Sequence, residues 1–221
     1  MKATFRAWCL ILGLASALAF ASPTPLTTPD FSADIVTHDA AGSVLNPGAR
    51  LYASNGKVRI ETPEATTGFF LIDAESTTAL FIRPAQRIFM DARQSTRLTQ
   101  LFLQVDPRDP CERWQAAAKN AGAPVAGDDW HCERVRAGRD VEYRVGSNPR
   151  NSTQRWIDPK LSFPVKVRIA DGTILELEHI KKEPQPAQLF AVPTDFHKLD
   201  PQALINRIKQ SDVWVEPPKA N

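Results

Sequence analysis

The sequence lacks a charge excess of either sign. Its 221 residues include 27 lysines and arginines and 25 aspartates and glutamates, which gives a formal net charge of +2. Binding to nucleic acid through its phosphates needs a strong basic excess on one face. The charge balance therefore argues against a nucleic-acid binder, and 43% hydrophobic with 24% charged residues is typical of a globular protein.

The sequence also lacks a hydrophobic run of the roughly 20 residues that a membrane-spanning helix needs. The apolar run Ala7–Phe20 is shorter, follows the basic residues Lys2 and Arg6, and ends in the small-x-small pattern Ala19-Phe20-Ala21. These features are typical of a secretory signal peptide. We expect residues 1–21 to be cleaved and the mature protein to be soluble; the alternative is an N-terminal helix that stays attached.

Cysteine is scarce. Cys9 lies within the expected signal peptide, so the secreted chain keeps only Cys111 and Cys132. In an oxidising compartment two remaining cysteines favour a disulfide bond. The alternatives are two free thiols, or a metal site with the adjacent His131. Zinc takes four ligands, and no other Cys or His lies at ligand spacing, so we expect no metal.

Catalytic motifs are missing as well. The sequence has no Gly-x-Ser-x-Gly, no His-Glu-x-x-His, no P-loop and no Gly-x-Gly-x-x-Gly. His38 and His179 fall near strand ends, where a surface or hydrogen-bonded histidine is common, and Asp128-Asp129 is typical of a solvated turn. We expect neither an enzyme nor a bound cofactor.

What the sequence does contain is alternation of apolar and polar residues, which predicts half-buried strands. Two short runs, Phe69–Ile72 and Ala79–Ile82, are apolar on both faces. Asp171-Gly172 predicts a hairpin turn, and Asn46-Pro47-Gly48 predicts another turn. The predicted strands cover residues 31–36, 57–61, 69–72, 79–82, 87–91, 141–145, 165–169 and 175–177.

Helical spacing replaces alternation in an insertion at about residues 95–122. Leu98, Leu101 and Phe102 predict a helix between Ser95 and Val105, and a second helix is expected from Pro110 to about Ala121. A third helical pattern covers 201–210. Residues 22–30 should form an extended lead-in, and residues 31–221 a single domain.

Together these elements predict an α+β domain, an unclosed antiparallel β-barrel of about nine or more strands whose helices cover the concave face. Two short helices cover only part of such a sheet. The remaining apolar concavity is either a filled core or a pocket for an apolar ligand.

The C-terminal half contains the motifs Trp156-Ile157-Asp158-Pro159, Phe163-Pro164-Val165-Lys166-Val167, Asp171-Gly172, Leu175-Glu176-Leu177, Gln185-Pro186 and Leu189-Phe190-Ala191-Val192-Pro193. In these motifs it resembles the C-terminal half of periplasmic lipoprotein-carrier-like proteins, the Lol-type carrier and its relatives. The resemblance implies a periplasmic half-barrel whose hydrophobic concave face is covered by helices and accommodates acyl chains. The carrier's arginine after a Pro-rich turn has no match, so a lipid-binding or sensing relative fits better than a lipoprotein shuttle.

Two functions therefore stay open. The first is a monomeric periplasmic protein that holds a lipid or acyl chain in the half-barrel, in outer-membrane lipid or lipoprotein trafficking, with an envelope membrane protein or lipoprotein as partner. The alternative is a non-catalytic envelope sensor or protein-interaction module whose concave face is filled by its own side chains.

For the first function we expect a lipid pocket. Its walls should be the apolar residues at every second position of the strands and the apolar face of one helix. A shift of one residue would exchange the two faces of the doubly apolar strands. Trp156 is a candidate for stacking on a ligand, with a core position as its alternative. The candidate pocket residues are Phe69, Leu71, Leu80, Ile82, Leu101, Phe102, Trp156, Val165, Val167 and Leu177.

Overall fold

The computed structural model describes residues 29–61, 68–93, 98–122, 130–136, 140–146 and 152–200. The expected signal peptide, most of the lead-in, Asp128-Asp129 and the predicted helix at 201–210 lie outside this part of the chain. Among the described residues, no helix has the length and hydropathy of a membrane span.

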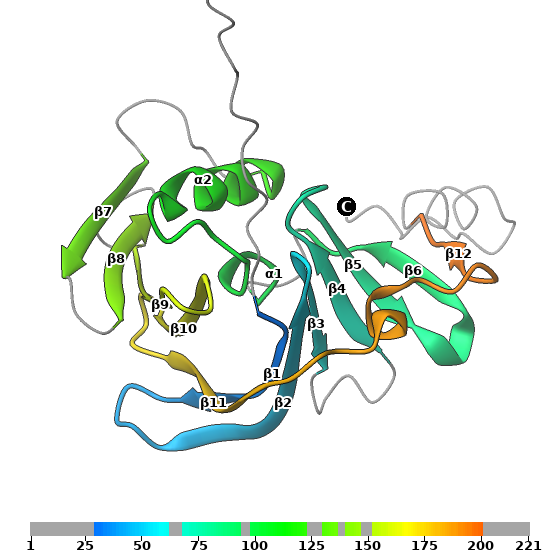
Figure 1. Ribbon diagram of the computed structural model, residues 1–221, viewed down its shortest axis with the longest axis horizontal. Helices are drawn as coiled ribbons and strands as arrows, with labels where there is room; N and C mark the ends of the chain where they lie inside the picture. Colours follow the sequence, from blue (N-terminus) through cyan, green and yellow to red (C-terminus); the bar gives the residue numbers. More distant parts are fainter. Residues whose placement is uncertain are drawn as a thin grey trace, which may run out of the picture.

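The described strands form one sheet in the order β12-β6-β5-β4-β3-β2-β1-β11-β10-β9-β8-β7. Its neighbouring strands are antiparallel except for the short parallel pair of β12 and β6. The sheet curves without pairing its end strands β7 and β12, so the predicted open half-barrel is confirmed (Figure 1). The strands are β1 (Phe31–His38), β2 (Val44–Ser54), β3 (Lys57–Glu61), β4 (Phe69–Asp73), β5 (Thr78–Arg83), β6 (Ile88–Asp91), β7 (His131–Arg136), β8 (Val141–Gly146), β9 (Thr153–Asp158), β10 (Phe163–Arg168), β11 (Ile174–Lys182) and β12 (His197–Lys198).

Two α-helices, α1 (Leu98–Leu101) and α2 (Pro110–Asn120), lie over the hollow of the sheet (Figure 1). The second helix was predicted almost to the residue, because Pro110 occupies its first turn and Gly122 follows its end with φ +80°. Two short 3-10 helices, η2 (Pro84–Gln86) and η5 (Ala187–Phe190), complete the described elements.

The first helix is shorter than the sequence predicts. Of the expected span, the α-helix covers only α1, and residues 102–105 continue in non-helical conformation. Phe102, Leu103 and Val105 are all buried, so this segment has no solvent face for a helix to present. The Val105 amide instead donates to the Ser162 carbonyl oxygen, 3.0 Å away.

One predicted turn is confirmed and the other is wrong. Gly172 takes φ +89° in the turn between β10 and β11, as the Asp-Gly pair predicts. Residues 46–48, however, lie inside β2 opposite a register shift of β1. The β1–β2 chain reversal comes earlier, where the Asp39 carboxylate accepts hydrogen bonds from the amides of Ala41 and Ser43.

The hollow of the half-barrel is filled by an interior core, the buried cluster around Phe31, Phe102 and Phe163. The Phe31 and Phe163 rings meet edge to face with centroids 5.2 Å apart, and the Phe102 ring stacks on Phe163 at 6.4 Å. None of the three rings is exposed. These rings therefore pack closely between the sheet and the 102–105 segment.

The strands β4 and β5 bury both of their faces. Ile72 pairs with Ala79, and both face the interior core. Their neighbours face the opposite side of the sheet, where the chain after β11 crosses back towards β12 (Figure 1). We call this second group the outer cluster; it comprises Phe69, Leu71, Leu80, Ile82, Phe89, Val192 and Phe196.

Substitution of Leu177 on β11 tests which face of this strand is buried in the interior core. Its side chain is 6% exposed in the interior core, so Leu177→Lys should lower the free energy of unfolding by about 3 kcal/mol or more, because it buries an unpaired charge. The matched change Glu178→Lys lies directly opposite Asp34, on the other face, and should be nearly neutral. Urea denaturation compares the two variants, and equal stabilities would contradict an apolar interior at β11.

Candidate functional site

The predicted pocket residues divide between the two faces of the sheet. Leu101, Phe102, Val167 and Leu177 belong to the interior core, and Val165 packs against it. These side chains are brought together as expected on the concave face. They fill that face themselves, since Phe102 and Val167 have no exposed surface.

The remaining strand residues were assigned the wrong face. Phe69, Leu71, Leu80 and Ile82 lie in the outer cluster, because Phe69 pairs with Glu61 and Leu71 with Arg59 in the register of β3. The neighbouring residues Phe70 and Ile72 face the interior core instead. Continuous apolar runs carry no alternation, so their phase depends on the register with β3.

Trp156 also lies on the outer face. It alternates with the buried Arg155 and Ile157, and the Lys166 ammonium lies 6.0 Å from its ring centroid. The half-buried Trp156 ring thus has a cation–π contact with Lys166 at the protein surface. Trp156 therefore takes no part in a site on the concave side.

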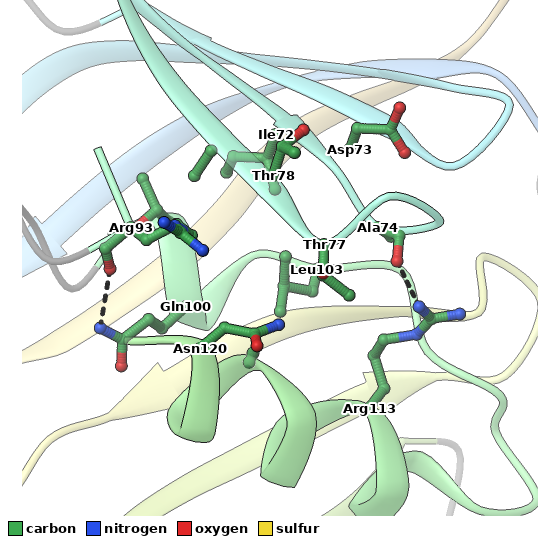
Figure 2. A pocket seen from close by; sticks show the side chains of 13 residues that line it. Ile72, Asp73, Ala74, Thr77, Thr78, Arg93, Gln100, Leu103, Arg113 and Asn120 are labelled. Atoms are coloured by element: carbon green, nitrogen blue, oxygen red, sulfur yellow. Dashed lines mark hydrogen bonds between the residues drawn. The ribbon is translucent and has the colours of Figure 1, made fainter. Parts of the chain in front are cut away.

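An open pocket remains at one edge of the interior core, between α2 and the β4–β5 turn (Figure 2). Its cavity volume is about 30 Å³, and the empty space rises to about 390 Å³ when the adjoining open solvent is included. We call it the α2 pocket. Its apolar lining consists of Ile72, Ala74, Ala79, Leu103 and Ala117, and its polar lining includes Thr77, Thr78, Arg93, Gln100, Arg113 and Asn120.

One face of α2 forms a wall of the α2 pocket. Arg113, Ala117 and Asn120 are spaced by four and three residues, which places them on one side of a helix. The adjacent face of α2, with Trp114 and Ala118, is buried, and the pocket face was not among the predicted site residues. The same helical spacing could have revealed it, with a small alanine between two polar residues as the signal.

The charged side chains at the pocket differ in the partners to which they are bound. The Arg93 guanidinium binds the Asp91 carboxylate, with Nη2 and Oδ2 2.6 Å apart, and this hydrogen-bonded contact lowers the pKa of Asp91. The Asp73 carboxylate accepts hydrogen bonds from the amides of Glu75 and Ser76. Arg113 donates to the carbonyl oxygen of Ala74, and no carboxylate among the described residues pairs with it.

The other side of α2 is fixed to the far half of the sheet. The predicted disulfide between Cys111 and Cys132 is confirmed and joins α2 to β7. Trp114 packs edge to face on Tyr143 of β8, with ring centroids 5.7 Å apart. The Arg155 guanidinium of β9 lies 4.7 Å from the Trp114 ring centroid, so α2 contacts three successive strands.

Arg155 also connects these strands to α1. Its Nη1 donates to the Gln100 carbonyl oxygen at 3.4 Å and its Nε to the Thr153 hydroxyl at 3.0 Å. Burial lowers the pKa of Arg155 to about 9, so the guanidinium is still charged at neutral pH. The two helices are thereby held over the strands β8 and β9, while the α2 pocket lies on their opposite side.

Comparison with known proteins finds similar solved structures but no relatives by sequence. No family model matches the chain, and no curated protein sequence matches it. The solved structures similar to it include a LolA superfamily protein. This protein, NE2245 from Nitrosomonas europaea, has a TM-score of 0.36 and 11% identity, over 76% of this chain and 91% of its own. The neighbours thus include the superfamily that the sequence resembles.

Two further neighbours are larger than this chain. MucB has a TM-score of 0.38 and 13% identity, over 76% of this chain and 58% of its own, and has also been solved in complex with MucA(peri). PNGF-II has a TM-score of 0.48 and 8% identity, over 82% of this chain and 33% of its own. At these scores and identities, neither the ligands nor the partners of the neighbours transfer to this chain.

Removing the disulfide tests how firmly α2 is fixed. The bond closes a loop of about 22 residues, and chain entropy predicts that its loss lowers the free energy of unfolding by about 3 kcal/mol. The double variant Cys111→Ser, Cys132→Ser should therefore unfold at lower urea concentration than the oxidised protein. Equal urea midpoints for the two would contradict a stabilising role for the bond.

Proposed function

We propose that the chain is a non-catalytic binding protein of the cell envelope that holds one apolar chain, from a lipid or an acylated ligand, in the α2 pocket. The observation that carries this proposal is the open apolar lining of Ile72, Ala79, Leu103 and Ala117 at the edge of an interior core that is otherwise filled. The site is thus the edge of the half-barrel and not its centre.

The chemistry of the α2 pocket supports this function. Small-molecule sites usually have an apolar lining with a few polar groups. The α2 pocket has such a lining, and its cavity volume of about 30 Å³ means that it must widen to take a ligand chain. Because Phe31, Phe102 and Phe163 occupy the hollow, the proposal places the chain at the edge and not in the interior.

The proposed location in the envelope has two supports. The N-terminal residues have the pattern of a secretory signal, and the disulfide bond of Cys111 with Cys132 suits an oxidising compartment such as the periplasm. Acyl chains are available there from membrane lipids and from lipoproteins. Either source is compatible with a site that takes a single chain.

The filled interior favours a second candidate function, a module that binds another envelope protein and carries no lipid. Its supporting observation is the complete burial of the aromatic rings of the interior core. The two candidates differ in one measurable property, which is the affinity of the purified protein for an acyl chain.

Filling the α2 pocket with a ring should remove lipid binding. Ala117→Phe places an aromatic side chain where the ligand chain would lie, and we expect it to weaken binding of the fluorescent fatty acid cis-parinaric acid by about tenfold or more. Fluorescence titration of the wild type and the variant measures the two dissociation constants.

The matched control is Ala116→Phe, the same substitution on the neighbouring residue of α2, which does not line the pocket. It should bind the fatty acid within about twofold of the wild type. A wild type that binds neither cis-parinaric acid nor its methyl ester would refute the lipid proposal and leave the protein-binding module. Equal weakening by both variants would refute the assignment to this pocket.

A further inference from the structure

We propose that the ligand of the α2 pocket is an anionic amphiphile, a molecule that joins a carboxylate or phosphate group to an apolar chain, and that Arg113 binds its anionic group. This inference rests on the proposed function and adds the chemical class of the ligand. It follows from the one cation that the described pocket residues leave without an acidic partner.

The position of Arg113 suits a head-group contact. It lies on the same face of α2 as Ala117, four residues before it, so a chain packed on Ala117 would have its end near the guanidinium. Figure 2 shows the Arg113 side chain extending from α2 towards the Ala74 carbonyl at the β4–β5 turn. Its charge is therefore at the rim of the pocket and its stem is beside the apolar lining.

The guanidinium keeps hydrogen-bonding capacity for a ligand. It has five N–H donors in a planar fork, and the contact with the Ala74 carbonyl engages only one of its nitrogens. A carboxylate or phosphate accepts two parallel hydrogen bonds from such a fork. A neutral ester or alcohol cannot form the same charged, bidentate contact.

The other charged groups of the pocket do not offer this contact. Arg93 uses both Nε and Nη2 on the Asp91 carboxylate, so this pair is neutral as a whole. The Asp73 carboxylate is engaged by backbone amides within its own turn. Among the described residues at the pocket, Arg113 is thus the group that can select for a negative charge.

The test compares cis-parinaric acid with its uncharged methyl ester at about pH 8, where the acid is ionised. The wild type should bind the acid about tenfold more tightly than the ester. Arg113→Gln should weaken binding of the acid by about tenfold and leave that of the ester within about twofold. The ester thereby reports whether the variant still folds and keeps its apolar pocket.

The matched control is Lys119→Gln, which removes one positive charge from the exposed side of the same helix. It should leave both affinities within about twofold of the wild type. Dodecyl phosphate should displace the bound fluorescent acid, whereas inorganic phosphate at the same concentration should not, because the apolar chain supplies most of the binding energy.

The outcomes separate this inference from the proposed function. If the wild type binds acid and ester equally and Ala117→Phe weakens both, the pocket binds apolar chains and the assignment of Arg113 is wrong. If Arg113→Gln weakens acid and ester alike, Arg113 supports the fold and does not select the ligand. If inorganic phosphate displaces the fluorescent acid as effectively as dodecyl phosphate, the ligand is not an amphiphile and the site binds simple anions.

Discussion

A strongly curved sheet exposes an apolar concave face that has to be covered, and the rest of this structure depends on how that face is covered. Here the chain between β6 and β7 covers it. Leu101, Phe102 and Leu103 enter the hollow and pack on the aromatic side chains of β1 and β10. Burial of these rings contributes about 2 kcal/mol or more for each side chain. The consequence is a filled centre, with the α2 pocket at its edge.

The position of α2 follows from this arrangement. On one side, Trp114 and the disulfide of Cys111 fix the helix to β7, β8 and β9. On the other side, Arg113 reaches the β4–β5 turn through a single hydrogen bond to a carbonyl. The helix is held much more firmly on the first side than on the second. The α2 pocket lies on the less firmly held side.

Much of this architecture was predictable because periodicity reports burial directly. Alternation located β1, β3, β8 and β11, and Pro110 with Gly122 located α2. The phase of β4 and β5 was not predictable, because runs such as Phe69–Ile72 are apolar on both faces and only pairing with Arg59 and Glu61 orients them. The α2 pocket was not predicted because its lining comes from segments far apart in the sequence. The one local indication was Ala117, a small residue on an otherwise polar helix face.

The most direct test of the central account is to locate a bound chain by NMR, with a spin-labelled fatty acid added to protein that has labelled methyl groups. The account predicts the strongest line broadening at Ile72, Leu103 and Ala117, with weaker effects deep in the interior core at Val167. Strongest broadening at Leu71 and Leu80 of the outer cluster, or no site-specific broadening at all, would contradict it.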